Sequence, residues 1–556
     1  ASYRPTLVNE FRFQYARRRS GARRNEFSGT GPSIIIRSVA NFGPPIVGDP
    51  KLPTFAVTQF QDNVTLNSGT HVTKFGGGFS HHGYAERSPI FSQYRFLTID
   101  KYIQARNGCV PNCYIDYTET FGDPEIRYQA TYWNFFVQDD WKITRRLKLT
   151  YGLRYDLYKI PKADPTSPFP LSRKFNVDKN DLSPRIGVAY ALREGNRPTV
   201  LRIGAGVYYD APLLAIYRDV IHINGNPRFS SYTFGPGAGP TFPHTLDTLP
   251  AGSLLAQQDI FTIAPDFETM YAMHISGQIQ QAVTEDLSFT AGYVHSAGRH
   301  INVYRDINPI GPVRYLEDGR PVFGNDHLDA RFGSIVIAES GGVAQYDALT
   351  LQLNQRSARG LQFAVNYTLS KATNDAPDGD FEGLYLSDPT NRNVDRGYSS
   401  ADQRHTFVMS LVARPQLQFT NRILRGLINH NQFGVIATAN SGERFSIYSN
   451  FDLNNDGFRI DRPIGFVRNS ERTPKQFNLD LRYSRLFSLS DRFQLEAFAE
   501  AQNLLNINSI VRFNNVSVVS DPVTGRLIGT LPDFRARDQS VAQDSRQIQL
   551  GVKFTF

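Results

Sequence analysis

The sequence contains no long hydrophobic run. Its most apolar short stretch is the isoleucine triplet at positions 34–36, whereas a helix that spans a membrane needs about 18 consecutive apolar residues. A membrane-spanning helix is therefore excluded. Hydrophobic residues make up only 40% of the 556 residues and the mean hydropathy is -0.37, so no segment has the composition of a large soluble core.

Cysteine is nearly absent, because the chain has only Cys109 and Cys113, separated by Val110, Pro111 and Asn112. No set of His or Cys residues lies near them, which argues against a zinc site and against catalytic thiols. The spacing favours a small loop disulfide formed in an oxidising compartment. Residues 1–5 show no targeting segment, so either a signal was removed or the chain begins within a longer protein.

Clustered charge of one sign is also scarce. The formal net charge is +8, but acidic and basic residues are scattered along the chain, which argues against a nucleic-acid partner. One basic cluster exists, formed by Arg17, Arg18, Arg19, Arg23 and Arg24. A solvated loop is the favoured interpretation, and contact with anionic lipid headgroups outside the cell is the alternative.

What the sequence does contain is alternation of apolar and polar residues over about 9 to 11 positions, the length of a tilted strand that crosses a bilayer. In residues 147–157, Leu and Tyr alternate with Lys, Thr, Gly, Arg and Asp. Residues 361–370 and 477–483 repeat the pattern. The 40 Phe, 27 Tyr and 43 Gly suit strands and turns.

Period-two counting predicts about sixteen strands. They are expected near residues 5–17, 54–67, 71–86, 128–143, 146–159, 183–194, 198–210, 270–283, 287–300, 343–356, 360–375, 404–416, 429–441, 475–487, 493–506 and 546–556. The strands of a soluble sandwich would also show this alternation of apolar and polar residues. In this chain, however, short turns alternate with connections of tens of residues. That layout is typical of an antiparallel transmembrane β-barrel in the outer membrane of a Gram-negative bacterium, with all of residues 1–556 in the barrel.

The last strand ends on Phe554 and Phe556, which resembles the signal that the barrel assembly machinery recognises. If this strand ends in the periplasm, the short turns are periplasmic and the long loops are extracellular. Cys109 and Cys113 then lie outside the cell, where a disulfide is expected. The aromatic side chains of Tyr132, Trp133, Trp141, Tyr151 and Tyr155 are expected to form girdles at the membrane interfaces.

Several ordered segments resemble the barrel of TonB-dependent receptors of the Oar-like branch, which carry a carboxypeptidase-regulatory-like domain. They are VNEFRF (8–13), FVQDDW (136–141), LSPRIGVAY (182–190), YDALTLQ (346–352), YTLSK (367–371), DQRH (402–405), DLNNDG (452–457) and AEAQNLLN (499–506). The resemblance implies a 22-stranded barrel, a plug, and import of an unidentified ligand, for which carbohydrate is one expectation. The plug, through which TonB would act, and the first strands are not in this sequence.

One candidate metal site is the segment DLNNDG. Asp452, Asn454 and Asp456 reproduce the opening of an EF-hand calcium loop, with Asp461 as a substitute for the carboxylate that Pro463 replaces. An ordinary Asn/Asp/Gly turn is the alternative. His81 and His82 are adjacent on a strand and would not chelate one ion together. Residues 235–240 lack the Lys of a phosphate loop and are expected to form a flexible external loop.

No enzyme signature was found, so catalysis is not expected. Three functions remain open. The favoured one is a receptor barrel whose external loops capture a ligand for import. A passive sixteen-stranded porin is the first alternative, since an even number of strands can close into a barrel. A surface protein that holds partners with its loops is the second.

Overall fold

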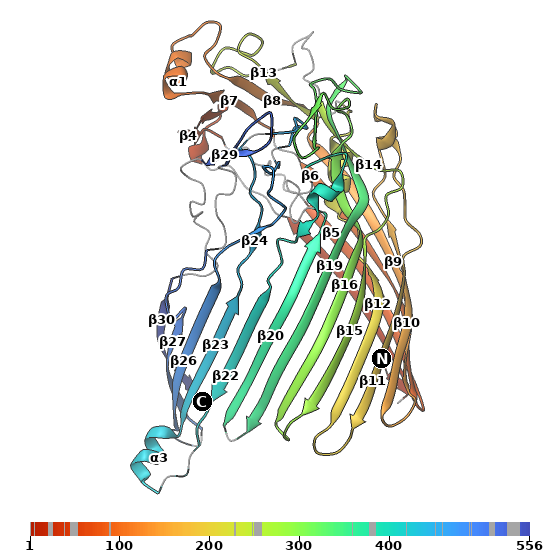
Figure 1. Ribbon diagram of the computed structural model, residues 1–556, viewed down its shortest axis with the longest axis vertical. Coiled ribbons are helices and arrows are strands. Elements are labelled where there is room, and N and C mark those ends of the chain that lie inside the picture. The colour runs from red at the N-terminus through yellow and green to blue at the C-terminus, as the bar shows by residue number, and fades with distance from the viewer. Residues whose placement is uncertain are drawn as a thin grey trace.

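The computed structural model describes residues 2–4, 6–19, 26–37, 39–44, 54–87, 90–226, 229–246, 248–249, 258–358, 360–376, 385–416, 418, 420–450, 452–458, 460–488, 490, 492–510, 518–530 and 545–556. One large curved sheet dominates it (Figure 1). Sixteen long strands of this sheet pair antiparallel, each with the next along the chain. Three short strands, β1 (Ser2–Arg4), β14 (Gln258–Ile263) and β21 (Gly397–Tyr398), add to its margins.

The predicted all-β, antiparallel fold is confirmed, and each predicted strand has its counterpart. The sixteen strands are β2 (Leu7–Arg19), β5 (Thr54–Ser68), β6 (His71–Arg87), β9 (Glu125–Lys142), β10 (Leu147–Lys159), β11 (Leu182–Arg193), β12 (Thr199–Tyr209), β15 (Tyr271–Ala282), β16 (Leu287–Asp306), β19 (Phe332–Ala358), β20 (Leu361–Asn374), β22 (His405–Ala413), β23 (Asn431–Asn440), β26 (Gln476–Ser488), β27 (Gln494–Gln502) and β30 (Gln547–Thr555). β16 and β19 extend beyond the prediction, because the upper part of β19 also pairs in parallel with β14.

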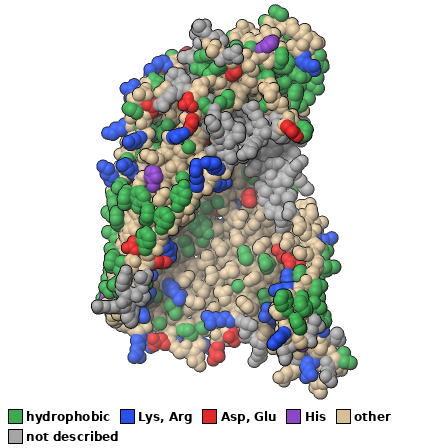
Figure 2. All heavy atoms as spheres, turned by 180° about the vertical axis from the view of Figure 1, so that it is seen from behind, with side chains coloured by type: hydrophobic (Ala, Val, Ile, Leu, Met, Phe, Trp, Pro, Cys, Tyr) green, Lys and Arg blue, Asp and Glu red, His purple; other side chains and the backbone are tan. Residues whose placement is uncertain are grey.

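Alternation along the strands gives the sheet two different faces. Across the pair β10–β11, Leu149 lies opposite Val188 and Leu153 opposite Pro184, which places apolar side chains on one face. Thr150 lies opposite Gly187, and Gly152 opposite Arg185, on the other. We call these the outer face and the inner face. Figure 2 shows the hollow side of the sheet, where Lys and Arg side chains lie among other polar atoms.

The two ends of the sheet also differ. Both chain termini and the short turns lie at one end, here called the turn end (Figure 1). Gly69, with φ of +59°, forms one of these turns, because the left-handed region favours glycine. One connection at this end is longer than expected, since residues 414–430 include helix α3 (Arg422–Ile428). The long connections gather at the opposite end, here called the loop end.

The loop end carries a second sheet, built from three different connections. Its order is β13 (Phe229–Phe234), β8 (Asp116–Gly122), β7 (Ser92–Phe96), β3 (Ser33–Ile36) and β4 (Ala40–Phe42), with helix α1 (Ile99–Arg106) beside it. Tyr94, Phe96 and Tyr117 form its fully buried aromatic centre. The loop layer therefore has a hydrophobic core of its own.

A second loop core lies closer to the long strands. Helix α2 (Leu214–His222) buries Ile216, Tyr217 and Val220 against Ile263 of β14 and Val336 of β19. Shorter elements complete the layer: the 3-10 turns η1 (Glu26–Ser28), η2 (Pro170–Arg173) and η4 (Arg392–Asp395), and the hairpins β17 (Arg314–Tyr315)–β18 (Pro321–Val322), β24 (Arg444–Phe445)–β25 (Glu471–Arg472) and β28 (Val518–Ser520)–β29 (Leu527–Thr530). None of the helices in the described ranges is long and apolar enough to span a membrane.

The sheet has two long edges, formed by β2 and β30. β30 pairs only with β27, and β2 pairs with β5 on one side and, over Leu7 and Val8 alone, with the short strand β1 on the other. No pairing joins β2 to β30 within the described part of the chain. Side chains on these two strands are exposed, Phe11 of β2 by 63% and Leu550 of β30 by 77%. An unpaired edge presents a row of free N–H and C=O groups, so these two strands can accept further strands.

Candidate functional site

A groove runs along the inner face of β10, β11, β12 and β15. It consists of two connected depressions of about 440 Å³ and 410 Å³, which share Thr150, Gly187, Gly204 and Ser276. Gly187 and Gly204 lie directly opposite each other on neighbouring strands and form the floor. A Cβ atom at Gly187 would meet its nearest neighbour at 3.8 Å, so the missing side chains leave open space there. We call this depression the inner-wall groove.

The charges around the inner-wall groove do not balance. Lys148 is 3.1 Å from Asp140, and Arg154 is 2.7 Å from Asp156, so both are neutralised. Arg185 instead lies over the ring of Tyr208, 4.3 Å from its centroid, and Arg202 donates to the amide oxygen of Gln280 at 2.9 Å. Within the described ranges, neither arginine has a carboxylate partner. The groove therefore carries two uncompensated guanidinium groups.

Two residues before Ser183, which lines the loop-end part of the inner-wall groove, lies a buried acidic group that the sequence did not single out. Asp181 immediately precedes β11 and is fully buried, and neither of its carboxylate oxygens has a hydrogen-bond partner within the described structure. Burial and repulsion by Asp178 raise the pKa of Asp181 to about 7. Ser183, which lines the groove, is also buried, with an unpartnered hydroxyl group.

The loop layer is held together by buried ion pairs. Arg462 lies 2.9 Å from Asp395, and both side chains are only 4% exposed. Asp402 binds two arginines, Arg444 at 3.0 Å and Arg472 at 2.7 Å. These pairs join the connection at residues 375–404 to the one at residues 441–475, so these two loops form one packed unit.

The predicted calcium segment lies inside this unit. Asp452 accepts hydrogen bonds from the backbone of Asn455 at 2.6 Å and of Gly457 at 2.8 Å, as in an Asx turn. Asp456 accepts from the backbone of Phe458, and Asp461 from that of Leu453.

Burial and mutual repulsion raise the pKa of Asp456 well above its ordinary value, and burial raises that of Asp461 to about 7. Asn454, fully buried, donates to Asp456. No group of three or more His, Cys, Asp or Glu side chains in the described chain is arranged to hold a metal ion. Calcium binding at these residues stays a prediction.

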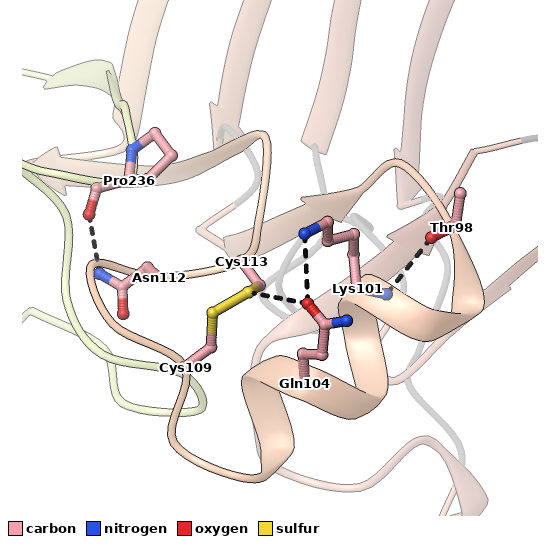
Figure 3. The surroundings of a disulfide bond; sticks show 7 residues. All are labelled: Thr98, Lys101, Gln104, Cys109, Asn112, Cys113 and Pro236. Atoms are coloured by element: carbon pink, nitrogen blue, oxygen red, sulfur yellow. Dashed lines mark hydrogen bonds between the residues drawn. A yellow bond between two sulfur atoms is a disulfide. The ribbon is translucent and has the colours of Figure 1, made fainter.

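Cys109 and Cys113 form a disulfide bond at the far end of the loop layer (Figure 3). The bond closes the segment that follows α1, whose N-terminus is capped by the Thr98 side chain. Asn112 donates to the backbone oxygen of Pro236 at 2.8 Å (Figure 3). Tyr114 donates to the backbone oxygen of Pro240 at 3.0 Å. Residues 235–240, expected to be flexible, therefore pack against the disulfide segment.

The predicted girdle residues do not all share one face. Trp133 and Trp141 of β9 lie on the outer face. Tyr151 and Tyr155 of β10 lie on the same face, opposite Asp139 and Phe135 of β9. Tyr132 lies on the inner face, where its ring meets Tyr158 edge-on at 5.1 Å. Its assignment to the girdle is wrong, because neighbouring residues of a strand point to opposite faces.

Two further groups of residues were named from the sequence. His81 and His82 lie on opposite faces of β6 and bind Thr131 and Ser80 respectively. Arg17, Arg18 and Arg19 end β2 as exposed residues, whereas Arg23 and Arg24 lie outside the described residues. Lipid contact by this cluster stays a prediction. Phe554 and Phe556 stack at 6.3 Å at the turn end, and their role in assembly is likewise a prediction.

The sequence profile of the outer membrane beta barrel domain matches residues 2–467. The chain therefore belongs to this family and is a β-barrel protein of the outer membrane of a Gram-negative bacterium. No curated protein sequence matches it.

Solved structures share the fold at low identity. The outer membrane transporter YddB from Escherichia coli is 12% identical, with a TM-score of 0.60 over 100% of this chain and 61% of that one. The ferripyoverdine receptor of Pseudomonas aeruginosa is 10% identical, with a TM-score of 0.51 over 99% of this chain and 54% of that one. FpvAI, solved with pyocin S2, has the same identity and TM-score and is covered over 52%. The chain thus spans about half to three-fifths of these structures.

Proposed function

We propose that this chain is the barrel portion of a TonB-dependent receptor, of the Oar-like branch, which captures a ligand with its external loops and imports it through the lumen. The ordered motifs from VNEFRF to AEAQNLLN support this assignment. The transporter and the receptors that share the fold support it at the level of the barrel. Binding falls to loops and lumen wall, and no catalytic group takes part.

The observation that carries the proposal is the open sheet. Sixteen strands pair in sequence, yet β30 and the part of β2 beyond Val8, where the short strand β1 ends, keep exposed outer edges. Free strand edges are not stable in lipid, because their N–H and C=O groups find no water there. We therefore assign the space between β2 and β30 to further strands outside these 556 residues, as part of a 22-stranded barrel that holds a plug.

The test is the intact mass of the protein purified from outer membranes, together with peptide mapping of its N-terminus. The proposal expects a mass well above 62.7 kDa, with peptides of a plug domain before Ala1. A mature protein that begins at Ala1 would contradict it.

A passive porin is the second candidate, favoured by the even number of strands, since β2 and β30 run antiparallel and could pair. Liposome swelling separates the two functions. A porin admits a small neutral sugar such as arabinose at once, whereas a plugged receptor does not admit it without an energy source.

A further inference from the structure

We infer that the inner-wall groove binds an elongated solute that carries at least two anionic groups, carboxylate or phosphate, on its path through the barrel. This inference rests on the proposed function, because only a ligand that enters the lumen meets this wall. It adds the chemical class of that ligand and the residues that recognise it.

The first argument is the position of the uncompensated charges. Arg185 lies opposite Gly206, and Arg202 opposite Ala189, so the two arginines are four residues apart along the strands. At about 3.3 Å per residue, this separation is roughly 13 Å, with Arg185 nearer the loop end and Arg202 nearer the turn end. A single small anion cannot bridge that distance, whereas a chain of anionic groups can contact both guanidinium groups.

The second argument is the space between the arginines. Gly187 and Gly204 have no side chains to fill the space through which a ligand would pass, and Ser276 and Gln278 of β15 line the same stretch. Ser183 lines the groove two residues before Arg185, and its hydroxyl group is buried without a partner behind this lining. Neutral hydrogen-bond donors thus lie around a recess that has a cationic arginine at each end. This arrangement suits a polar anionic chain.

The third argument is the fixed orientation of Arg185. Its guanidinium group rests on Tyr208, and the ring of His274 meets Tyr208 at 5.0 Å and 65°. Stacking leaves the N–H groups at the edge of the guanidinium plane free to bind an oxyanion in two places. The arginine is therefore held in place before the ligand arrives, which reduces the entropy lost on binding.

The opposite part of the inner face shows that this charge is local. Arg482 on β26 binds Glu500 at 2.9 Å and Glu496 at 3.3 Å, so its charge is neutralised. Gly434 on β23 lies opposite Arg482 and also leaves open space, since a Cβ atom there would meet Arg482 at 3.7 Å. These two residues are matched controls: an arginine with partners and a glycine outside the inner-wall groove.

The test is calorimetric titration of the purified protein in detergent at low salt. The probes are trigalacturonate, which carries carboxylates, a short linear polyphosphate, and the neutral maltotriose. We expect at least one anionic probe to bind at least about tenfold more tightly than maltotriose, since hydrogen bonds between charged groups contribute more than neutral ones. The preferred probe identifies carboxylate or phosphate as the recognised group.

The variants locate the site. Arg185→Gln with Arg202→Gln should weaken binding of the anionic probe about tenfold or more. Gly187→Leu should abolish it by filling the recess, whereas Arg482→Gln and Gly434→Leu should leave it unchanged. Equal binding of all three probes, or equal loss in the control variants, would overturn the inference. Because the titration needs no energy source, such a result would leave the proposed import function standing.

Discussion

The long strands and the loop layer of this protein are stabilised in opposite ways. The strands form a single sheet with an apolar outer face and a polar, hollow inner face, and their backbone groups pair with the neighbouring strand. The loop layer instead buries an aromatic core around Tyr94 and Tyr117, together with ion pairs such as Arg462–Asp395. The apolar outer face of the sheet is therefore suited to contact with lipid, whereas the loop layer is stabilised by a buried core of its own, as small water-soluble domains are.

Because of this difference, we expect the largest loss of stability when a buried ion pair of the loop layer is broken. Replacing Asp395 with Ala leaves the buried Arg462 without its carboxylate, which costs about 3–5 kcal/mol. We expect the loops to become sensitive to protease while the barrel still assembles. Limited proteolysis of whole cells measures this. The control, Asp329→Ala, removes the exposed pair with Arg331 and should cost less than about 1 kcal/mol. Loss of the barrel from the membrane would contradict the independence of the two regions.

The second effect concerns the outer face of the sheet. Leu351→Arg places a charge among Leu349 and Leu353, on the face that meets lipid, and should cost about 2–4 kcal/mol. We expect less folded protein in the outer membrane, measured by its heat-dependent mobility on gels. Gln352→Arg, one residue further along, points to the inner face and should assemble normally. Equal loss in both variants would mean that the two faces are wrongly assigned.

The third effect is a pH dependence at the junction of the two regions. The pKa of Asp181 is raised to about 7, so the folded state binds an extra proton between about pH 4 and pH 7. Its contribution to the free energy of unfolding falls as the pH rises through this window, by at most about 1.4 kcal/mol per pH unit, and is constant above it.

We therefore expect the loops to resist thermal proteolysis better at pH 5 than at pH 8. Asp181→Asn should reduce this difference, with the remainder due to other buried carboxyl groups whose pKa is raised, such as Asp456 and Asp461. Asp326→Asn, at an exposed loop position, is the control. An unchanged pH dependence in Asp181→Asn would show that this carboxyl group is not protonated in the folded protein.

The smallest expected effect is that of calcium on the loop layer. Asp452, Asp456 and Asp461 are expected to bind calcium as weakly as extracellular modules do. Calcium at about 1 mM should then add roughly 1 kcal/mol to the stability of the loop layer. A rise in the temperature of loop proteolysis that is absent in Asp456→Asn would support the site. No rise in the unmodified protein would leave the segment as an ordinary turn.

The strands were predictable from the sequence and the loop layer was not. Alternation at period two locates β10 and β30 directly, because one face must be apolar and the other polar along the whole strand. No such period marks the sheet of β3, β7, β8 and β13, whose strands come from three connections and meet only in the folded protein. Tyr132 was misplaced because aromatic residues were grouped by proximity in sequence and not by alternation.

The inner-wall groove was missed for a related reason. Gly187, Gly204, Arg185 and Arg202 are unremarkable in sequence, since each is one polar position in an alternating strand. Only the register between β11 and β12 brings the two glycines opposite each other and places the arginines at the two ends of one recess. Charge balance likewise depends on pairs such as Lys148–Asp140 that form across strands.

The measurement that tests the central claim most directly is disulfide cross-linking across the open edge in outer membranes. With Phe11→Cys on β2 and Leu550→Cys on β30, in a Cys109→Ser, Cys113→Ser background, the account predicts no cross-link, because further strands separate β2 from β30. The positive control is Ala499→Cys with Leu550→Cys, which lie opposite each other in β27 and β30 and should cross-link. An efficient cross-link between β2 and β30 would contradict the account and show that sixteen strands close the barrel.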